Sequence, residues 1–301
     1  MTPTFIRRLL LPVFAALLAA CSTPPVKNPA SPQVVAPKPV IKPKAPVKIA
    51  LVLGGGAARG FAHVGVIKML EANGIKPDMV VGTSAGSVVG ALYAAGYNGF
   101  ELQKMAFELD ESNVSDWSLP NRGIVKGQAL QDYVNKAVRN QPIEKLKLPF
   151  GAVATNLTLG KSVLFQRGNT GQAVRASSSV PGVFQPVTIN GEDYVDGGVI
   201  SQVPIRYAKQ MGAGFTIAID VSGKPGKSQA TSTKEVLLKS LSIMSKTLRE
   251  QELKEADILI SPNVGDIAPD DFDSKNRAIL EGEQAAIKLM PLIKKKLAAL
   301  H

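Results

Sequence analysis

The stretch VVGTSAGSVVGALYAAG, residues 80–96, decides the fold of this chain. A β-branched run ends at Gly82, Ser84 follows, and small and apolar residues then continue to Gly96. A short β-branched run bounded by glycine is typical of a buried strand, and the longer run after the serine is typical of a helix. The stretch therefore predicts a strand, a tight turn and a helix, with Ser84 at the turn.

The spacing Gly-x-Ser-x-Gly at Gly82, Ser84 and Gly86 is the one found where a nucleophilic serine lies on a strained turn between strand and helix. In such an elbow the two glycines leave room around the serine, and the N–H of Ala85 can help to bind an oxyanion. The spacing also occurs by chance, and a serine that starts a helix is a common N-cap. Ser84 is therefore either a nucleophile or an N-cap, and its surroundings have to decide.

A glycine-rich stretch, KIALVLGGGAARG at residues 48–60, predicts a strand over 49–53, a loop, and a helix over about 60–73. It does not fit a dinucleotide fingerprint, because residue 59 is arginine and the next strand ends without the expected acid. Consecutive glycines at a helix N-terminus leave N–H groups uncovered where the helix dipole favours an anion. We therefore expect an oxyanion hole, and Arg59 either lends it charge or holds the loop by an ion pair. The residues assigned to this hole are Gly54, Gly55, Gly56, Arg59 and Gly60.

A serine hydrolase usually activates its serine with histidine, but this chain has only two. His63 lies on the helix after the glycine loop, where a local hydrogen bond is its more ordinary role, and His301 is the last residue. The stretch YVDGGVI offers a carboxylate instead, since Asp196 ends an apolar strand before Gly197 and Gly198. A carboxylate with a reference pKa of about 3.9 is a weak base, but desolvation raises its basicity. Asp-Gly is also a hairpin signal, so Asp196 is either a base or a turn residue.

Taken jointly, GGGAARG, GTSAG, SSSVPGVFQP and DGG closely resemble the bacterial patatin-like phospholipases over about residues 48–222. The resemblance implies a three-layer α/β/α sandwich with a mainly parallel central sheet. It implies a catalytic dyad in which Ser84 is the nucleophile and Asp196 the base, with the loop at residues 54–60 as the oxyanion hole. It also implies that His63 is not a dyad member and that the substrates are acyl esters of lipids. We expect no metal ion and no cofactor.

The rest of the sequence indicates one domain over residues 48–301, because strands and helices alternate and no second linker or internal repeat interrupts them. NGE between two apolar runs predicts a hairpin, and long helices are predicted from about Thr233 to Ala256 and from Asp273 to Leu300. The further strands are predicted at Met79–Val81, FGAVATNL (150–157), SVLFQ (162–166), PVTING with EDYVDGG (186–198), FTIAIDVS (215–222) and DILISPNV (257–264).

Residues 1–20 are interpreted as a lipoprotein signal peptide, because two arginines precede an apolar run that is too short to span a bilayer. LAAC ends at Cys21, the only cysteine, and resembles a lipobox in which the cysteine is lipidated. The alternative is an ordinary signal peptide cut near Ala20. Residues 21–47 are rich in proline without periodicity, which predicts an extended tether between the lipidated cysteine and the domain.

The formal net charge is +11, but seven basic residues and no acidic one precede residue 49. The predicted domain is thus only mildly basic, which disfavours nucleic acid as a partner. The expected partners are a membrane lipid substrate and the membrane reached through the anchor. Ser22 after the cysteine is compatible with the periplasmic face of an outer membrane, should the cell be Gram-negative.

The functional prediction is a serine acyl hydrolase that cleaves acyl esters of phospholipid or lysophospholipid through an acyl-enzyme. One alternative is an acyltransferase, since the same residues can pass the acyl group to an alcohol instead of water. The other alternative is a non-enzymatic membrane lipoprotein with an inherited site. The intact Ser84, Asp196 and glycine loop disfavour this last alternative.

Overall fold

The chain is described here from a computed structural model, which describes residues 46–110, 116, 123–222 and 231–300. These residues belong to one compact unit. The predicted signal peptide, Cys21, nearly all of the predicted tether and His301 lie outside the described residues. Among the helices that are described, none combines the length and the apolar character needed to cross a bilayer.

A mostly parallel sheet of eight strands forms the centre of the unit, in the order β5-β6-β3-β2-β1-β7-β8, with β4 also paired to β3. Strands β8, β7, β1, β2 and β3 pair in parallel, whereas β4 and β6 run antiparallel to β3. The mainly parallel sheet is therefore confirmed. The strands are β1 (Ile49–Leu53), β2 (Met79–Thr83), β3 (Phe150–Asn156), β4 (Lys161–Phe165), β5 (Val187–Ile189), β6 (Glu192–Asp196), β7 (Phe215–Ile219) and β8 (Ile258–Ile260).

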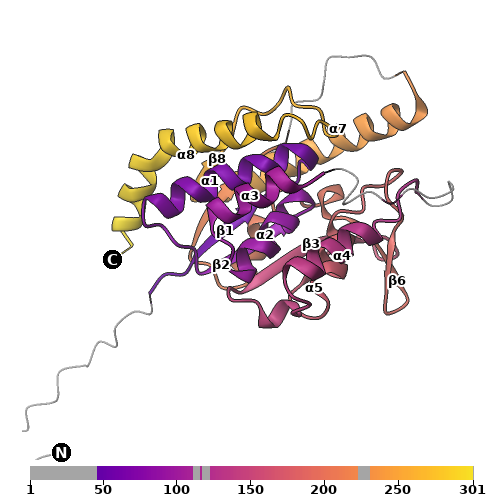
Figure 1. Cartoon of the computed structure of the whole chain (residues 1–301), viewed down its shortest axis with the longest axis horizontal. Helices are drawn as coiled ribbons and strands as arrows, with labels where there is room; N and C mark the ends of the chain where they lie inside the picture. The colour runs from indigo at the N-terminus through magenta and orange to yellow at the C-terminus, as the bar shows by residue number, and fades with distance from the viewer. Residues whose placement is uncertain (1–45, 111–115, 117–122, 223–230, 301) are drawn as a thin grey trace, which may run out of the picture. The chain divides into compact units, whose positions relative to one another are not determined.

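Helices cover both faces of the sheet, which confirms the three layers (Figure 1). Because side chains alternate along a strand, Leu51 and Leu53 of β1 pack with α1, α2 and α8, whereas Ala50 and Val52 pack with α6 and the end of α7. The helices are α1 (Phe61–Ala72), α2 (Ala85–Ala95), α3 (Gly99–Glu108), α4 (Gln128–Ala137), α5 (Thr170–Ser177), α6 (Ile205–Gln210), α7 (Thr233–Leu253) and α8 (Lys275–Ala298). Two 3-10 turns, η1 (Ala57–Gly60) and η4 (Gly197–Val199), flank the site described below.

Every predicted strand and both predicted long helices are present, but α3, α4, α5 and α6 were not predicted. The signal for α3 was in the sequence, because Asn98 and Glu101 form a capping box at its start. Helix α6 has six residues and is too short for a helical period to be recognised. The predicted hairpin is confirmed, since Asn190 and Gly191 both have positive φ between β5 and β6, as a type I′ turn requires.

Candidate active site

Strand β3 brings the end of β2 and the end of β6 together, because both strands pair with the same edge of β3, while β4 pairs with the other edge. Strand β2 ends at Thr83, opposite Val153, and β6 ends at Asp196, opposite the next residue, Ala154. The two strands run in opposite directions along this edge, so their ends meet. Ser84, which follows Thr83, therefore lies beside Asp196.

Ser84 occupies a strained turn between β2 and α2, with φ at 52° and ψ at −126°. Few residues other than glycine adopt such a φ, and the strain fits an elbow whose side chain must project. Ser84 stands at the N-cap position, but its hydroxyl makes no capping hydrogen bond. A Cβ at Gly82 would overlap the backbone of Gly86, which shows why the turn needs a small residue there. The arrangement favours the elbow over an ordinary N-cap.

Asp196 is only 6% exposed and holds its carboxylate between a turn and the serine. Its Oδ1 accepts a hydrogen bond of 2.7 Å from the N–H of Gly198, whereas Oδ2 has no hydrogen bond of ordinary geometry among the described residues. Burial raises the pKa of Asp196 to about 6, although the nearby Ser84 hydroxyl and the Gly198 N–H act to lower it. The residue is thus a turn cap and, through Oδ2, a carboxylate available to a proton donor.

The glycine after Asp196 permits close contact between the ends of β2 and β6. A Cβ on Gly197 would overlap the carbonyl oxygen of Val153 and come close to the methyl group of Thr83. Gly197 therefore lets the backbone pass next to Thr83, the residue before Ser84. A Cβ on Gly198 would instead overlap the side chain of Gln202.

The serine run that begins at the last residue of α5 connects Ser84 to Asp196. Ser177 Oγ accepts a hydrogen bond of 3.0 Å from the Ser84 N–H and donates one of 2.6 Å to the carbonyl of Val153. The carbonyl of Ser179 accepts a hydrogen bond of 2.9 Å from the Asp196 N–H. The motif SSSVPGVFQP carried the signal for this link, but nothing in the sequence distinguishes the roles of the three serines.

The glycine loop differs from the expectation that its N–H groups are all uncovered. The N–H of Gly54 donates to the carbonyl of Ile219 and that of Gly55 to the carbonyl of Gln202, both at 3.0 Å. These two groups therefore hold the loop in place and are not free donors. A Cβ on Gly55 would lie 3.2 Å from the Cβ of Ser84, so the loop does pass directly beside the serine.

Near Ser84, the N–H groups of Gly56 and Ala85 are among those without a hydrogen-bond acceptor in the described part of the chain. Gly60 contributes by packing, since a Cβ there would come to 2.6 Å from that of Ala85. Arg59 donates from Nε to the carbonyl of Ile267 at 2.7 Å, and burial lowers the pKa of its guanidinium. Of its two expected roles, the structure favours holding the loop, through a carbonyl and not through an ion pair.

His63 is fully buried on α1 and supports the same loop. Its Nε2 lies 2.8 Å from the carbonyl oxygen of Gly54, which can only accept, so Nε2 carries the proton. Burial lowers the pKa of His63 to about 4, and the ring is neutral at pH 7. The prediction of a local hydrogen bond is confirmed.

Gln202 is a residue that the sequence did not single out. Its backbone carbonyl accepts from the Gly55 N–H, and its side-chain Nε2 donates to the Gly55 carbonyl at 2.8 Å. Since the same side chain also lies against Gly198, it connects the glycine loop to the turn after Asp196.

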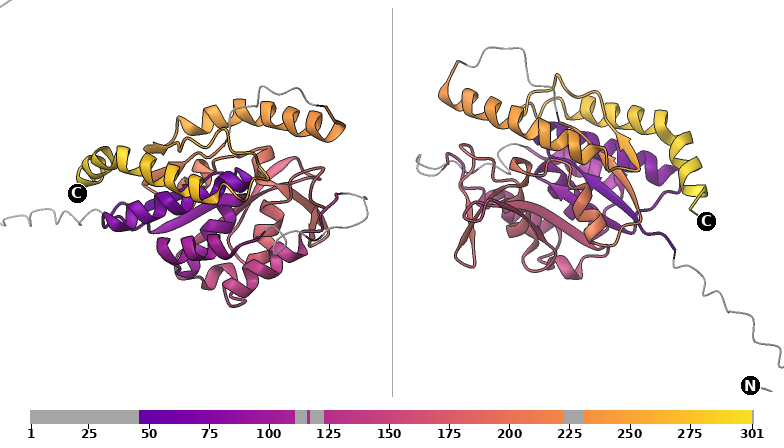
Figure 2. Two further views of the ribbon diagram at one scale, coloured as in Figure 1. Left: turned by 45° about the horizontal axis from the view of Figure 1, so that its top comes forward. Right: turned by 180° about the vertical axis from the view of Figure 1, so that it is seen from behind.

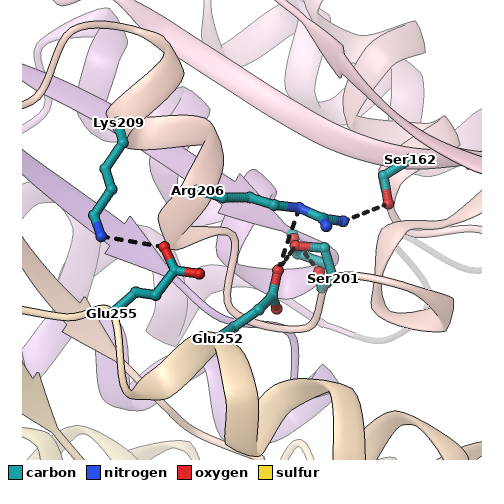
Figure 3. Close-up of polar contacts among 7 residues, drawn as sticks. Ser162, Ser201, Arg206, Lys209, Glu252 and Glu255 are labelled. Carbon is teal, nitrogen blue, oxygen red and sulfur yellow. Dashed lines mark hydrogen bonds and ion pairs between the residues drawn. The ribbon is translucent and has the colours of Figure 1, made fainter.

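A second serine and carboxylate pair, Ser201 with Glu252, is drawn in Figure 3. Ser201 Oγ donates to Glu252 Oε1 at 2.5 Å, and Arg206 Nε lies 3.6 Å from the same oxygen. The carbonyl of Ser201 accepts a hydrogen bond of 3.0 Å from Thr83 Oγ1, which connects the pair to the residue before Ser84. Burial raises the pKa of Glu252, against the opposing effects of Ser201 and Arg206.

Comparisons with known proteins identify relatives of this chain. Residues 51–209, which contain the glycine loop, Ser84 and Asp196, match the family described as patatin-like phospholipase. The chain is 38% identical over 179 residues to an uncharacterized NTE family protein of Mycobacterium tuberculosis, covering 58% of this chain and 49% of the relative. It is 37% identical over 184 residues to human patatin-like phospholipase domain-containing protein 6, covering 58% of this chain and 13% of that protein.

The solved structures give a likeness in fold alone. The crystal structure of VipD from Legionella pneumophila matches with a TM-score of 0.55 and 16% identity, over 82% of this chain and 67% of VipD. The match to the mycobacterial relative spans about half of that relative's length. Helices α7 and α8 lie beyond the residues that match the family.

Proposed function

This chain belongs to the patatin-like phospholipase family, and we propose that it is a serine acyl hydrolase acting on acyl esters of phospholipids or lysophospholipids. The observation that carries the proposal is that Ser84, which is strained and makes no capping hydrogen bond, lies beside the buried carboxylate of Asp196. A relative named lysophospholipase NTE1, from Yarrowia lipolytica, is 35% identical over 179 residues, which cover 58% of this chain and 12% of that protein. Its name supports lysophospholipid as one substrate class.

In the proposed first step, Ser84 Oγ attacks the ester carbonyl carbon while its proton passes to Asp196 Oδ2. The carbonyl π-electrons move to oxygen and form an alkoxide, for which the uncovered N–H groups of Gly56 and Ala85 are the proposed donors. The N-terminus of α2 adds positive potential at the same place. The alkoxide then collapses, the bond to the leaving alcohol breaks, and that alcohol takes the proton from Asp196.

In the second step, water replaces the alcohol. Asp196 accepts a proton from water, whose oxygen attacks the acyl-enzyme carbonyl and forms a second alkoxide. Collapse of this alkoxide releases the fatty acid and returns the proton to Ser84 Oγ. Each residue ends in its starting state, and no cofactor enters the sequence of steps.

The proposal is tested with a short-chain nitrophenyl ester and a fluorophosphonate probe. Wild-type protein should hydrolyse the ester and gain the mass of the probe on Ser84, while Ser84→Ala should do neither. Ser201→Ala is the matched control, because Ser201 also pairs with a buried carboxylate, and it should keep the label on Ser84. Probe mass on any other serine of the wild-type chain would contradict the assignment.

We also propose that the chain is exported and anchored by lipid at Cys21, on the strength of LAAC and the single cysteine. The tether of residues 22–47, extended at about 3.1 Å per residue, would reach at most about 80 Å and keep the domain near the membrane. Cys21→Ala should yield an unprocessed or soluble chain on fractionation. Release of the wild-type chain from membranes by high salt alone would show that no lipid holds it.

A further inference from the structure

Helix α7 lies on the outside of the folded unit, as its orange ribbon shows in Figures 1 and 2, and its side chains form an exposed apolar stripe. The stripe consists of five side chains that are between 45% and 68% exposed, namely Val236, Leu237, Ile243, Met244 and Leu248. Successive members are separated by one, six, one and four residues along the chain, which places them on one side of a helix. Ser240 and Thr247 lie within the stripe, and Lys239 and Lys246 border it three residues after Val236 and Ile243.

The two ends of α7 are fixed to the surroundings of the candidate active site. Near its C-terminal end, Arg249 Nε lies 3.5 Å from Asp220 Oδ2. Asp220 directly follows Ile219, the last residue of β7, whose carbonyl accepts a hydrogen bond from the glycine loop. Glu252 binds Ser201, and α7 packs against η4, which directly follows Asp196. Near the N-terminal end, Leu237 lies against Gly182 in the loop that follows the serine run. Helix α7, which carries the stripe, is therefore attached near both ends to elements that adjoin the site.

We propose that the α7 stripe docks onto a phospholipid surface and thereby holds the Ser84 site against the membrane that contains its substrate. The substrate class rests on the proposed function, but the docking itself does not require catalysis. An amphipathic helix that lies in the membrane plane buries its apolar face about 5–10 Å into the boundary between headgroups and acyl chains. The acyl ester bonds of phospholipids lie at that boundary, so docking would bring them next to the elements that carry the site.

The composition of the stripe favours lipid over a protein partner. Its polar positions are the small hydroxyl residues Ser240 and Thr247, and the bordering Lys239 and Lys246 have stems long enough to place their ammonium groups at the headgroups. Lys246 Nζ also lies 3.7 Å from Glu250 Oε1, but an exposed pair of this kind contributes little and can give way to a lipid phosphate. At about 1.5 Å per residue, α7 is long enough to lie along about 30 Å of membrane surface.

The test uses residues 22–301, which keep the whole described unit but lack the lipidated cysteine, so that only the folded chain can bind. Vesicles of ether-linked phosphatidylcholine with phosphatidylglycerol contain no acyl ester and measure binding apart from catalysis. We expect wild type to sediment with the vesicles and the double variant Ile243→Ser/Met244→Ser to lose about tenfold or more in partitioning, because two large apolar side chains no longer enter lipid. Both should hydrolyse a soluble nitrophenyl ester at rates within about twofold, whereas hydrolysis of ester-lipid vesicles should fall with binding.

The matched control is Leu280→Ser/Ile287→Ser on α8, which removes two apolar side chains that are 51% and 56% exposed on another helix. This variant should bind vesicles like wild type. Equal binding by the α7 variant, or an equal loss in the α8 variant, would overturn the proposal. So would a wild-type dimer in light scattering that the α7 substitutions break without any vesicle binding, because the stripe would then bind a second copy. Vesicle binding without ester hydrolysis would overturn the proposed function and leave the docking intact.

Discussion

Two buried serine and carboxylate pairs lie close together in this protein, Ser84 with Asp196 and Ser201 with Glu252. Burial raises the pKa of both carboxylates, and Thr83 lies between the pairs, preceding one serine and donating to the carbonyl of the other. By residue type alone, either pair could be a nucleophile with its base.

The pairs differ in what surrounds them. Ser84 is strained at the start of a helix and lies near the N–H groups of Gly56 and Ala85, which have no acceptor among the described residues. Ser201 is completely buried, already donates a hydrogen bond to Glu252, and shares that carboxylate with Arg206. The comparison teaches that a serine and a carboxylate become a candidate catalytic pair through the backbone around them.

The two pairs should differ most in how much a substitution of the carboxylate lowers activity. Asp196→Asn keeps the shape of the side chain but removes the proposed base, so kcat for a soluble ester should fall by about 10²–10⁴. Glu252→Gln, the same change in the other pair, should lower kcat less than about tenfold, because Glu252 touches no proposed reacting atom. Steady-state kinetics measure both, with circular dichroism to verify folding. Near-normal activity of Asp196→Asn, with loss of activity in folded His63→Ala, would instead identify His63 as the base.

Stability should change in the opposite direction from activity at Asp196. Its folded pKa, about 6 against a reference value of 3.8, means that ionisation of the buried carboxylate costs about 3 kcal/mol of folding free energy above pH 6. Asp196→Asn removes this cost, so the variant should be more stable than wild type at pH 8 by up to about 3 kcal/mol. The gain should shrink as the pH falls through 6 toward 4, where wild type becomes protonated. Denaturant titrations at pH 4 and pH 8 measure it, and a gain independent of pH would point to another cause.

The pH dependence of catalysis should report the same carboxylate. The proposed base must be ionised, so kcat/KM should fall about tenfold per pH unit below a midpoint of about 6 and be level above it until another group titrates. His63, whose pKa is lowered to about 4, should not contribute to this limb, and His63→Ala should leave its midpoint in place. If the acidic limb of the profile shifts in His63→Ala, the titrating group is the histidine and not Asp196.

The smallest effect is a change in stability on substitution of the carboxylate in the second pair, and it tests the structural role of that pair. Glu252→Ala leaves the buried Ser201 hydroxyl without an acceptor and should cost about 1–3 kcal/mol of unfolding free energy. Glu252→Gln keeps an acceptor and relieves a buried charge, so its cost should stay below about 1 kcal/mol. Chemical denaturation compares the two. Equal losses would show that the charge near Arg206, and not the acceptor, is what the pair contributes.

Much of the fold could be predicted from local pattern. Strands β1 and β2, the glycine loop and the serine turn follow one another within residues 49–96, where hydrophobic period and glycine position specify each element. Short helices such as α5 and α6 could not be predicted, because fewer than three turns give too few residues to show a period. Their stability comes from packing on the sheet, which no local window contains.

The sequence by itself determined the candidate residues, because a strained turn needs Ser84 between glycines and a close backbone approach needs glycine after Asp196. It did not determine which N–H groups of the glycine loop stay uncovered. That depends on carbonyl groups of Ile219 and Gln202, which come from distant parts of the chain. Only the tertiary structure decided it, and only the shared edge of β3 brought Ser84 and Asp196 together, because pairing between distant strands is set by the packing of the whole sheet and leaves no local pattern.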